Sequence, residues 1–192
     1  CYEIETLKSI KDVCERHGLG FHMDGARLWN AMIAKDQSPK DFGKLFDTIS
    51  VCLSKGLGAP MGSVLIGDND LMKNAIRVRK VLGGGMRQVG FMAAAGLYGV
   101  KHQWDRLAED HKRAQEIGEV LSTLPFVLHV EPIDTNIVIF KIATNEDEFI
   151  AKMAEKDIQF YSMGHGKLRL VTHHDYSERM HQYFLEVLQS MD

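Results

Sequence analysis

The sequence has few cysteines and no long hydrophobic run, and both absences narrow the class of protein. Only three of the 192 residues are cysteine, namely Cys1, Cys14 and Cys52. An odd count without a C-x-x-C pair predicts free thiols, no disulfide framework and no metal site, as expected of a cytoplasmic protein in a reducing compartment. No apolar run approaches the roughly 18 residues needed to span a bilayer, and the first residues do not resemble a signal peptide.

Neither sign of charge dominates the sequence. The formal net charge is −3, which gives no reason to expect nucleic acid or an anionic membrane as a partner. The hydrophobic fraction is 45%, enough for a chain of this length to bury a substantial core as one domain or as two small ones.

What the sequence does contain is a lysine between a β-prone run and a glycine-rich loop. The segment 48–53 is apolar and ends at Ser54-Lys55, and three glycines and a proline follow within seven residues. Such a loop places an amine at the edge of a sheet with little side-chain bulk around it. Desolvation there would favour the neutral amine, which can form a Schiff base with a carbonyl. The plain alternative is a lysine that only keeps a loop soluble.

An acidic residue that also follows a short apolar run makes a purely solubilising role for Lys55 less favoured. Asp24 ends the short apolar run 19–23 and precedes a segment with the pattern of a helix. The distance along the chain from Asp24 to Lys55 is long enough for one βαβ crossover, and the carboxyl ends of such strands form the ligand side of an open α/β sheet. An acid and a lysine placed there are the pair that a pyridoxal phosphate enzyme needs, one for the pyridine nitrogen and one for the aldehyde.

The same residues carry a family resemblance. The segments HMDGARLWNA and SVCLSKGLGAPMGS, followed in order by VLGGGMRQ and LRLVTH, resemble the L-threonine aldolases of the fold-type I pyridoxal phosphate superfamily. The resemblance extends over the whole sequence. It implies an α/β fold, with part of the large domain of such an enzyme (a mixed, mostly parallel sheet with flanking helices) followed by a small C-terminal α+β domain.

The first residue is a cysteine and no strand precedes the first expected helix, so the sequence is expected to be the later part of a longer protein. In the resembled family, the earlier part holds the loop that binds the cofactor phosphate and the side chain stacked on the pyridine ring. Without them, this stretch alone is expected to be inactive.

A change in the pattern of expected helices and strands predicts where the two domains meet. A polar connector is expected over 36–47 and a helix rich in Lys and Arg over 70–81. A longer amphipathic helix over 105–124 ends before Pro125. Short strands around two helices follow, which is typical of a small α+β domain with an antiparallel sheet. The boundary is therefore expected between a large-domain part at 1–124 and a small domain at 125–192.

The resemblance also implies roles for particular residues. A helix starting just after Asp24 would place Arg27 one turn away, where both could reach one ligand. An arginine within an apolar strand is costly to bury without an anionic partner, and its guanidinium matches a carboxylate bidentately. Glycine-rich loops favour anions through their backbone amides. The implied assignments are Lys55 and Asp24 for catalysis and cofactor binding, Arg27 and Arg169 for the substrate carboxylate, and Lys80 and Arg87 for the cofactor phosphate.

Some of these residues could instead have no functional role. Arg27 could be an ordinary surface arginine, and Arg169 an outward-facing residue of a one-sided strand. Cys52 lies three residues before Lys55 in the apolar run, and a buried, inert thiol is favoured there over a redox-active one.

The implied reaction is the cleavage of L-threonine, L-allo-threonine and related β-hydroxy-α-amino acids to glycine and an aldehyde by a retro-aldol step. Another fold-type I activity, β-elimination or transamination, remains an alternative, and so does a non-catalytic fragment. The sequence offers no convincing base for the β-hydroxyl proton. Because members of the family are commonly dimers of dimers, a homo-oligomer (dimer or tetramer) with an amino-acid substrate is expected.

Overall fold

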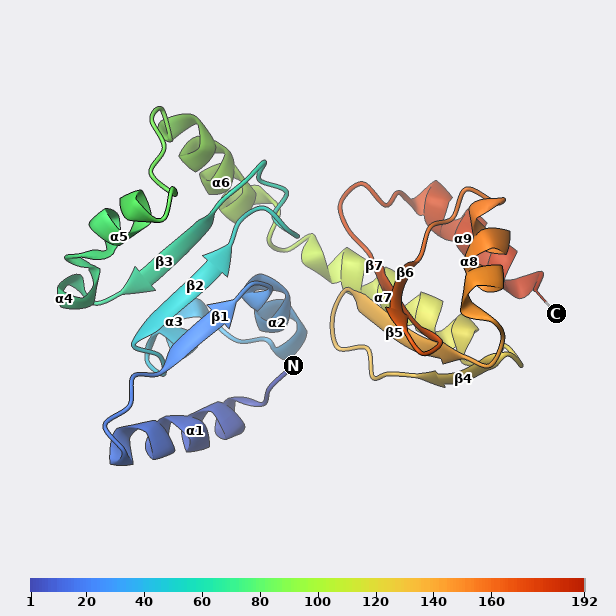
Figure 1. Cartoon of the computed structure of the whole chain (residues 1–192), viewed down its shortest axis with the longest axis horizontal. Coiled ribbons are helices and arrows are strands. Elements are labelled where there is room, and N and C mark those ends of the chain that lie inside the picture. Colours follow the sequence, from blue (N-terminus) through green and yellow to red (C-terminus); the bar gives the residue numbers. More distant parts are fainter. Residues whose placement is uncertain (192) are drawn as a thin grey trace. The chain divides into compact units, whose positions relative to one another are not determined.

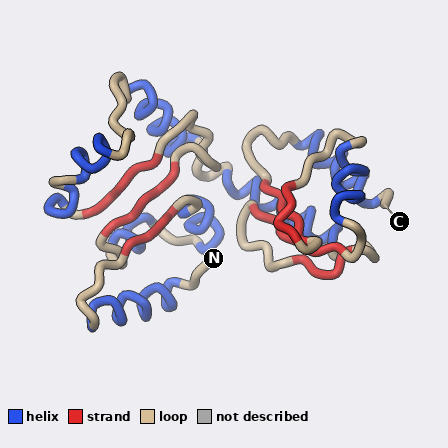
Figure 2. Tube along the Cα trace, in the orientation of Figure 1, coloured by secondary structure: helices blue, strands red, loops and turns tan. Residues whose placement is uncertain are grey.

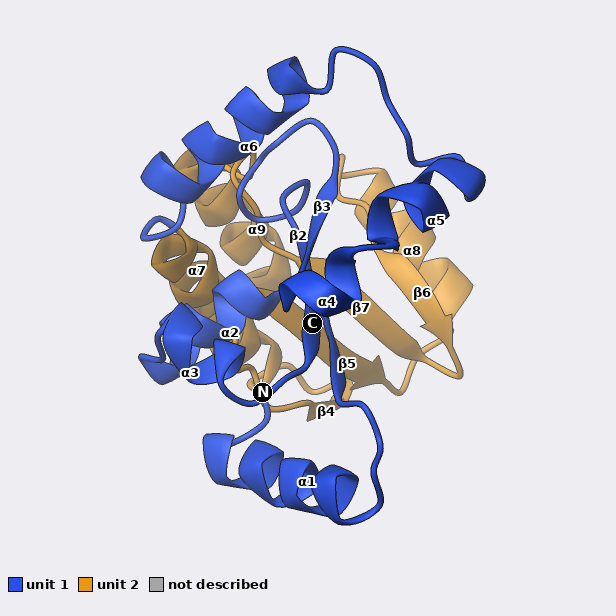
Figure 3. Cartoon of the chain, turned by 90° about the vertical axis from the view of Figure 1, so that its left-hand side faces the viewer, with its two compact units in different colours: residues 1–106 blue, residues 107–192 orange. Residues whose placement is uncertain are grey.

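The computed structural model describes residues 1–191. The chain divides into two compact units, one over 1–106 and one that begins at Leu107. The two units are coloured separately in Figure 3, and each is described by itself. No helix in the described part of the chain is both long and apolar enough to cross a membrane.

The first unit contains a three-stranded sheet with the order β1-β2-β3 (Figure 1). Strands β1 and β2 are parallel, and β3 runs antiparallel to β2, so the sheet is mixed. The elements of this unit are α1 (Ile4–Arg16), β1 (His22–Gly25), α2 (Leu28–Lys35), α3 (Pro39–Gly43), β2 (Thr48–Cys52), β3 (Ser63–Gly67), α4 (Asn69–Met72), α5 (Ala75–Val81) and α6 (Gly90–His102).

Buried and partly exposed side chains alternate along β2, and this pattern shows which face of the sheet is covered. Ile49 and Val51 are buried in a core shared with α1, α2 and α3, whose contributions include Leu7, Met32 and Phe42. Since successive side chains of a strand point to opposite faces, the residues between them turn away from this core. One face of the sheet therefore supplies packing, and the other carries the polar side chains described below.

Two segments of this unit differ from the expected pattern. The connector over 36–47 contains the short helix α3, which begins with a capping box in which Ser38 and Asp41 satisfy each other's backbone amides. The helix expected over 70–81 is divided into α4 and α5 around Lys73 and Asn74. The asparagine side chain can hydrogen-bond nearby backbone groups in non-helical conformations. An interruption of the helix at Asn74 is therefore less costly than at a strong helix former.

The second unit is a four-stranded antiparallel sheet with the order β4-β5-β7-β6 (strands in red in Figure 2). Its core joins Val138, Phe140 and Leu168 of the sheet to Ile117 and Phe184 of the helices. The elements are α7 (Leu107–Leu121), β4 (Val127–Val130), β5 (Ile137–Ile142), α8 (Glu146–Ala154), β6 (Tyr161–Gly164), β7 (Lys167–Val171) and α9 (Glu178–Gln189).

Helix α7 belongs to the second compact unit, whereas the sequence assigns it to the first predicted domain. This helix buries Ala114, Ile117 and Leu121 in the core of the second unit, so the units divide between Arg106 and Leu107. The sequence places the boundary between 124 and 125 instead, because the amphipathic pattern shows that a helix buries one face without showing against which sheet. The domain boundary stays a prediction.

Glu146, the first residue of α8, ties that helix to the β6–β7 hairpin. Its carboxylate accepts hydrogen bonds from the Ser162 hydroxyl and from the Gly166 backbone amide, the latter at 2.8 Å. The hydrogen bond from Ser162, followed by that from Gly166, lowers the pKa of Glu146 below its usual value of 4.5. A depressed pKa in the folded state contributes stability above the unfolded-state pKa, and that contribution is lost as the pH falls through the folded-state pKa.

We therefore expect Glu146→Gln to lower the free energy of unfolding at pH 7 and to weaken its dependence on pH below about 4.5. Urea unfolding at pH 7 and pH 3 measures both effects. Glu148→Gln, in the same helical turn, separates the loss of this hydrogen-bonded carboxylate from the loss of one acidic charge. Equal effects of the two substitutions would contradict the prediction.

Candidate active site

Lys55 lies in a short, tightly closed loop that begins where β2 ends. The Leu53 amide donates to the Gly62 carbonyl at 3.0 Å, the Ala59 amide to the Leu53 carbonyl at 3.1 Å, and the Gly58 amide to the Lys55 carbonyl at 2.8 Å. Gly58 has a φ of +69°, a backbone conformation that glycine adopts without steric cost. The glycine-rich sequence therefore forms a fixed turn with the lysine at its entrance.

Asp24 lies on the neighbouring strand, near the carboxyl end of β1. It pairs in register with Ser50 of β2, and its carboxylate accepts a hydrogen bond from the Ala26 amide at 3.2 Å. At Gly25, an added Cβ would lie 2.8 Å from the Ser50 carbonyl oxygen, so a side chain there would push the strands apart. Because β1 and β2 are parallel, Asp24 and the Lys55 loop lie at the same edge of the sheet.

The face of β2 opposite the core carries the small polar side chains Ser50 and Cys52. The sulfur of Cys52 accepts hydrogen bonds from Lys55 Nζ at 3.5 Å and from Ser63 Oγ of β3 at 3.4 Å. Cys52 is half-buried, so the expectation that this thiol is buried is wrong, and the expectation that it is inert stays a prediction. Lys55 itself is exposed, and the described residues do not by themselves supply the desolvation that the sequence predicts.

Arg27 does not stand on a helix that begins at Asp24. Strand β1 continues to Gly25, and Arg27 is the N-cap of α2, with φ −129° and ψ 33°. The expected helical spacing of one turn between Asp24 and Arg27 is therefore wrong, because the strand carries two more residues than the apolar run suggests. Both residues remain near the carboxyl end of β1, and the role of Arg27 toward a carboxylate stays a prediction.

Helix α6 packs directly against the lysine loop through two glycines. A Cβ on Gly96 would lie 2.7 Å from a methyl group of Leu53, and a Cβ on Gly99 would lie 2.7 Å from the Leu57 carbonyl oxygen. Leu57 is buried, with 2% of its surface exposed. Glycine at these two positions therefore permits close approach of α6 to the lysine loop.

We expect Gly99→Ala to destabilise the first unit by about 1–3 kcal/mol, the usual cost of overpacking, and to move the loop that carries Lys55. Neighbouring Ala95→Gly on the same helix is a control for changes in helix propensity. Chemical denaturation measures the stability, and amide hydrogen exchange at 56–59 reports the loop. Unchanged exchange in the loop would contradict the proposed contact.

The two predicted phosphate ligands lie on either side of the triple glycine. Lys80 is in α5 and Arg87 is in the loop before α6, and both side chains are exposed. An added Cβ on Gly85 would lie 2.7 Å from Lys80 Cδ, so the glycine loop folds back along the lysine side chain. Lys80 and Gly85 line a hollow together with Arg77 and Arg79, and Arg87 is not part of its lining. The phosphate contacts of Lys80 and Arg87 stay predictions.

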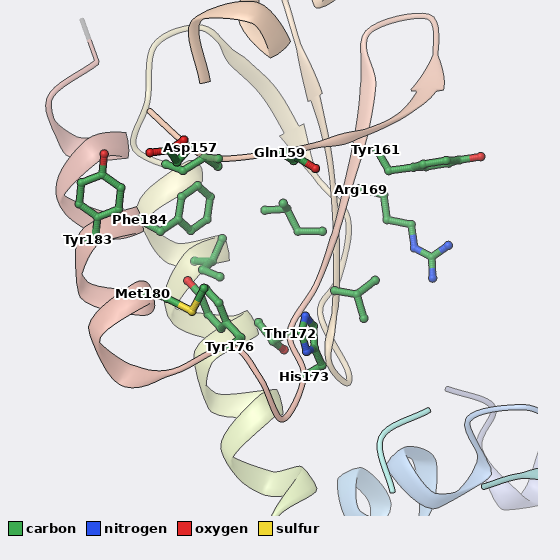
Figure 4. Close-up of a pocket in the computed structure, with 14 residues that line it drawn as sticks. Asp157, Gln159, Tyr161, Arg169, Thr172, His173, Tyr176, Met180, Tyr183 and Phe184 are labelled. Atoms are coloured by element: carbon green, nitrogen blue, oxygen red, sulfur yellow. The ribbon is translucent and has the colours of Figure 1, made fainter. Parts of the chain in front are cut away.

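Arg169 lies in the second unit, in the middle of β7. It pairs with Ile139 of β5 and with Tyr161 of β6. Figure 4 shows the Arg169 and Tyr161 side chains pointing away from Tyr183 and Phe184 of α9. Arg169 Nε is buried and has no hydrogen-bond partner among the described residues. A guanidinium with an unsatisfied donor can still bind an anion, which is consistent with the predicted carboxylate contact. The alternative of an outward-facing arginine on a one-sided strand stays open, and the role of Arg169 stays a prediction.

A network that the sequence did not reveal lies close to the same strand. His181 is fully buried, its Nε2 is 2.7 Å from Glu116 Oε2, and its Nδ1 is 3.2 Å from the Tyr176 hydroxyl. Arg113 also donates to the Tyr176 carbonyl oxygen at 2.8 Å, and burial raises the pKa of Tyr176. Tyr176 lines a pocket of about 800 Å³ (Figure 4). No sequence spacing predicts such a network, because Glu116 and His181 come from different helices.

The mixed sheet, the lysine loop and the acid at the end of the adjacent parallel strand together define the class of α/β enzymes that the sequence predicts. Comparison with known proteins then gives the family. The family model of the Beta-eliminating lyases matches residues 1–145, and the chain belongs to this family.

The chain is 34% identical to low-specificity L-threonine aldolase 1 of Arabidopsis thaliana over 194 residues, which is 98% of this chain and 54% of that protein. It is 39% identical to the low specificity L-threonine aldolase of Escherichia coli K12 over 175 residues, or 90% of this chain and 51% of that protein. The structure of Leishmania major threonine aldolase superposes with a TM-score of 0.80 at 25% identity, covering 98% of this chain and 56% of that one. The chain thus spans about half the length of the curated relatives it matches. The predicted family and fold class are confirmed.

The residues of the first unit fit pyridoxal phosphate by the chemistry of their donors. Lys55 supplies an exposed amine in a glycine-rich loop, and Asp24 supplies an exposed carboxylate at the same sheet edge. The cofactor needs an amine for its aldehyde and an acid for its pyridine nitrogen. Both groups are present.

Proposed function

We propose that this chain supplies the lysine-bearing part of a pyridoxal phosphate-dependent aldehyde-lyase. The substrates proposed are L-threonine, L-allo-threonine and related β-hydroxy-α-amino acids, which would be cleaved to glycine and an aldehyde. The observation that carries the proposal is the placement of Asp24 and Lys55 at one edge of two adjacent parallel strands. The similarity to relatives named as low-specificity L-threonine aldolases supports the choice of reaction.

In this proposal each side chain has one task. When bound, pyridoxal phosphate supplies an electron sink for the cleavage of the Cα–Cβ bond. Lys55 would hold the cofactor aldehyde through its amine. Asp24 keeps a proton on the pyridine nitrogen, because a carboxylate beside a cationic ring stabilises the protonated form.

The arginines are proposed to bind the substrate carboxylate. A guanidinium binds a carboxylate through two parallel hydrogen bonds, which fix orientation as well as position. The unsatisfied Nε of Arg169 is the observation that supports its role, and Arg27 is assigned by its position in the motif that follows Asp24. Lys80 and Arg87 are proposed to bind the cofactor phosphate. The chain is further proposed to act in the cytoplasm as a homo-oligomer.

Product analysis tests the reaction. The protein is incubated with pyridoxal phosphate and L-threonine or L-allo-threonine, and glycine, acetaldehyde, ammonia and 2-oxobutyrate are quantified. Equal amounts of glycine and acetaldehyde are expected. Ammonia with 2-oxobutyrate would favour elimination, and transfer of the amino group to the cofactor would favour an aminotransferase.

The alternative of a non-catalytic chain predicts a different outcome. In that case this chain forms no product, and borohydride fixes no cofactor on Lys55. A longer protein that includes the phosphate-binding loop forms the product and retains the cofactor on this lysine. Failure of both proteins would overturn the proposed cofactor.

A further inference from the structure

Cys52 is the last residue of β2 and the immediate neighbour of the proposed cofactor lysine in space. Its side chain lies on the face of the sheet opposite the buried Ile49 and Val51. There its sulfur receives two hydrogen bonds, one from Lys55 Nζ at 3.5 Å and one from Ser63 Oγ at 3.4 Å. Sulfur is a weak acceptor, so two donors directed at one thiol describe a local polar cluster rather than apolar packing.

The backbone that carries the Cys52 sulfur is fixed by hydrogen bonds, whereas the Lys55 amine is at the end of an exposed side chain. The Cys52 carbonyl oxygen accepts a hydrogen bond from Trp29 Nε1 at 3.0 Å, and Cys52 pairs in register with Ser63 of β3. The Leu53 amide, one residue on, is bonded to the Gly62 carbonyl. The Lys55 side chain, in contrast, is long and exposed, and it loses considerable rotamer freedom whenever it is fixed.

We infer that Cys52 is a positioning residue for Lys55: its sulfur holds the lysine amine at the end of β2, where the cofactor aldehyde is proposed to bind. The inference rests on the proposed function, since Lys55 must be the anchor for its position to matter. A side chain that is held in place before binding pays less of the ordering cost at the moment of binding. Cys52 therefore acts through Lys55 and takes no part in bond making.

Cofactor loading tests this role without an activity assay. Pyridoxal phosphate is titrated onto the 192-residue chain, fixed with borohydride, and the modified Lys55 peptide is quantified by mass spectrometry. Cys52→Ala removes the acceptor, and the loss of one hydrogen bond is expected to raise the half-loading concentration about threefold to tenfold. Cys52→Ser keeps an acceptor in nearly the same place, and loading close to wild type is expected.

Cys14→Ala is the matched control, because Cys14 is a half-buried thiol in α1, away from the lysine loop. If the wild type loads cofactor and Cys52→Ala loads it at the same half-loading concentration, the inference is overturned and the proposed function is left intact. Equal impairment by Ala and Ser would also overturn it, since that result means the sulfur only fills space. If neither the wild-type chain nor the longer protein that includes the phosphate-binding loop loads cofactor on Lys55, the result counts against the proposed function instead.

Thiol labelling tests the contact when no cofactor is present. A lysine ammonium stabilises the thiolate that reacts with iodoacetamide. Replacing Lys55 by Met is therefore expected to slow the alkylation of Cys52 about threefold to tenfold, while the rate at Cys14 stays the same. Equal Cys52 rates in the wild type and in Lys55→Met would overturn the inference, whatever the cofactor result.

Discussion

Lys55→Ala is expected to abolish covalent attachment of pyridoxal phosphate and to reduce glycine formation by several orders of magnitude. No other residue of the Lys55 loop carries an amine, and removal of a covalent catalytic group eliminates the step that depends on it. The absorbance band of the bound cofactor, and its fixation by borohydride, should be present in the wild type and missing in the variant.

The controls for this prediction come from the same part of the chain. Lys44→Ala removes an exposed lysine that precedes β2, and it should leave both the band and the fixed label on the Lys55 peptide unchanged. Circular dichroism of Lys55→Ala should match the wild type, since an exposed side chain is removed. If the label in the wild type is found on a different lysine, the assignment of Lys55 is wrong.

The sequence predicts the placement of Asp24 and Lys55 at one sheet edge better than it predicts the details of the backbone. Asp24 and Lys55 could be paired from the sequence because each follows an apolar run and glycines follow soon after, a local pattern that survives folding. The parallel register that places Asp24 beside Ser50 confirms that the two runs are neighbours. By contrast, the end of β1 was misjudged, because Asp24 and Gly25 continue the ladder although neither favours a strand.

Long-range contacts are what the sequence could not supply. The environment of Cys52 depends on Ser63, which lies across the antiparallel ladder, and an apolar neighbourhood in the sequence suggested a buried thiol. The packing of α7 in the second unit and the network of Glu116, His181 and Tyr176 likewise join residues from separate elements. One-dimensional periodicity gives the face that a helix buries, and only the fold shows which partner covers it.

The second large effect is expected at the centre of the second unit. Phe140 of β5 is fully buried and packs against Phe149 of α8, at a ring-centroid distance of 6.4 Å, and against Phe160, at 5.8 Å. Phe140→Ala is expected to cost about 3–5 kcal/mol, the lost transfer free energy plus the cavity left behind. That is a large fraction of the roughly 5–15 kcal/mol that stabilises a typical protein. Phe91→Ala, at a ring that is 76% exposed in α6, is the matched control and should change the free energy of unfolding by less than about 0.5 kcal/mol.

The same substitution tests whether the two units unfold independently. Phe140 pairs with Leu168, next to Arg169, whereas Lys55 belongs to a unit with its own core. In Phe140→Ala, urea unfolding followed by hydrogen exchange should show 107–191 opening at lower urea than residues 1–106, with Lys55 still reactive toward pyridoxal phosphate. Simultaneous loss of structure in both units would show that they fold as one cooperative body, and the separate cores would then not act as independent units.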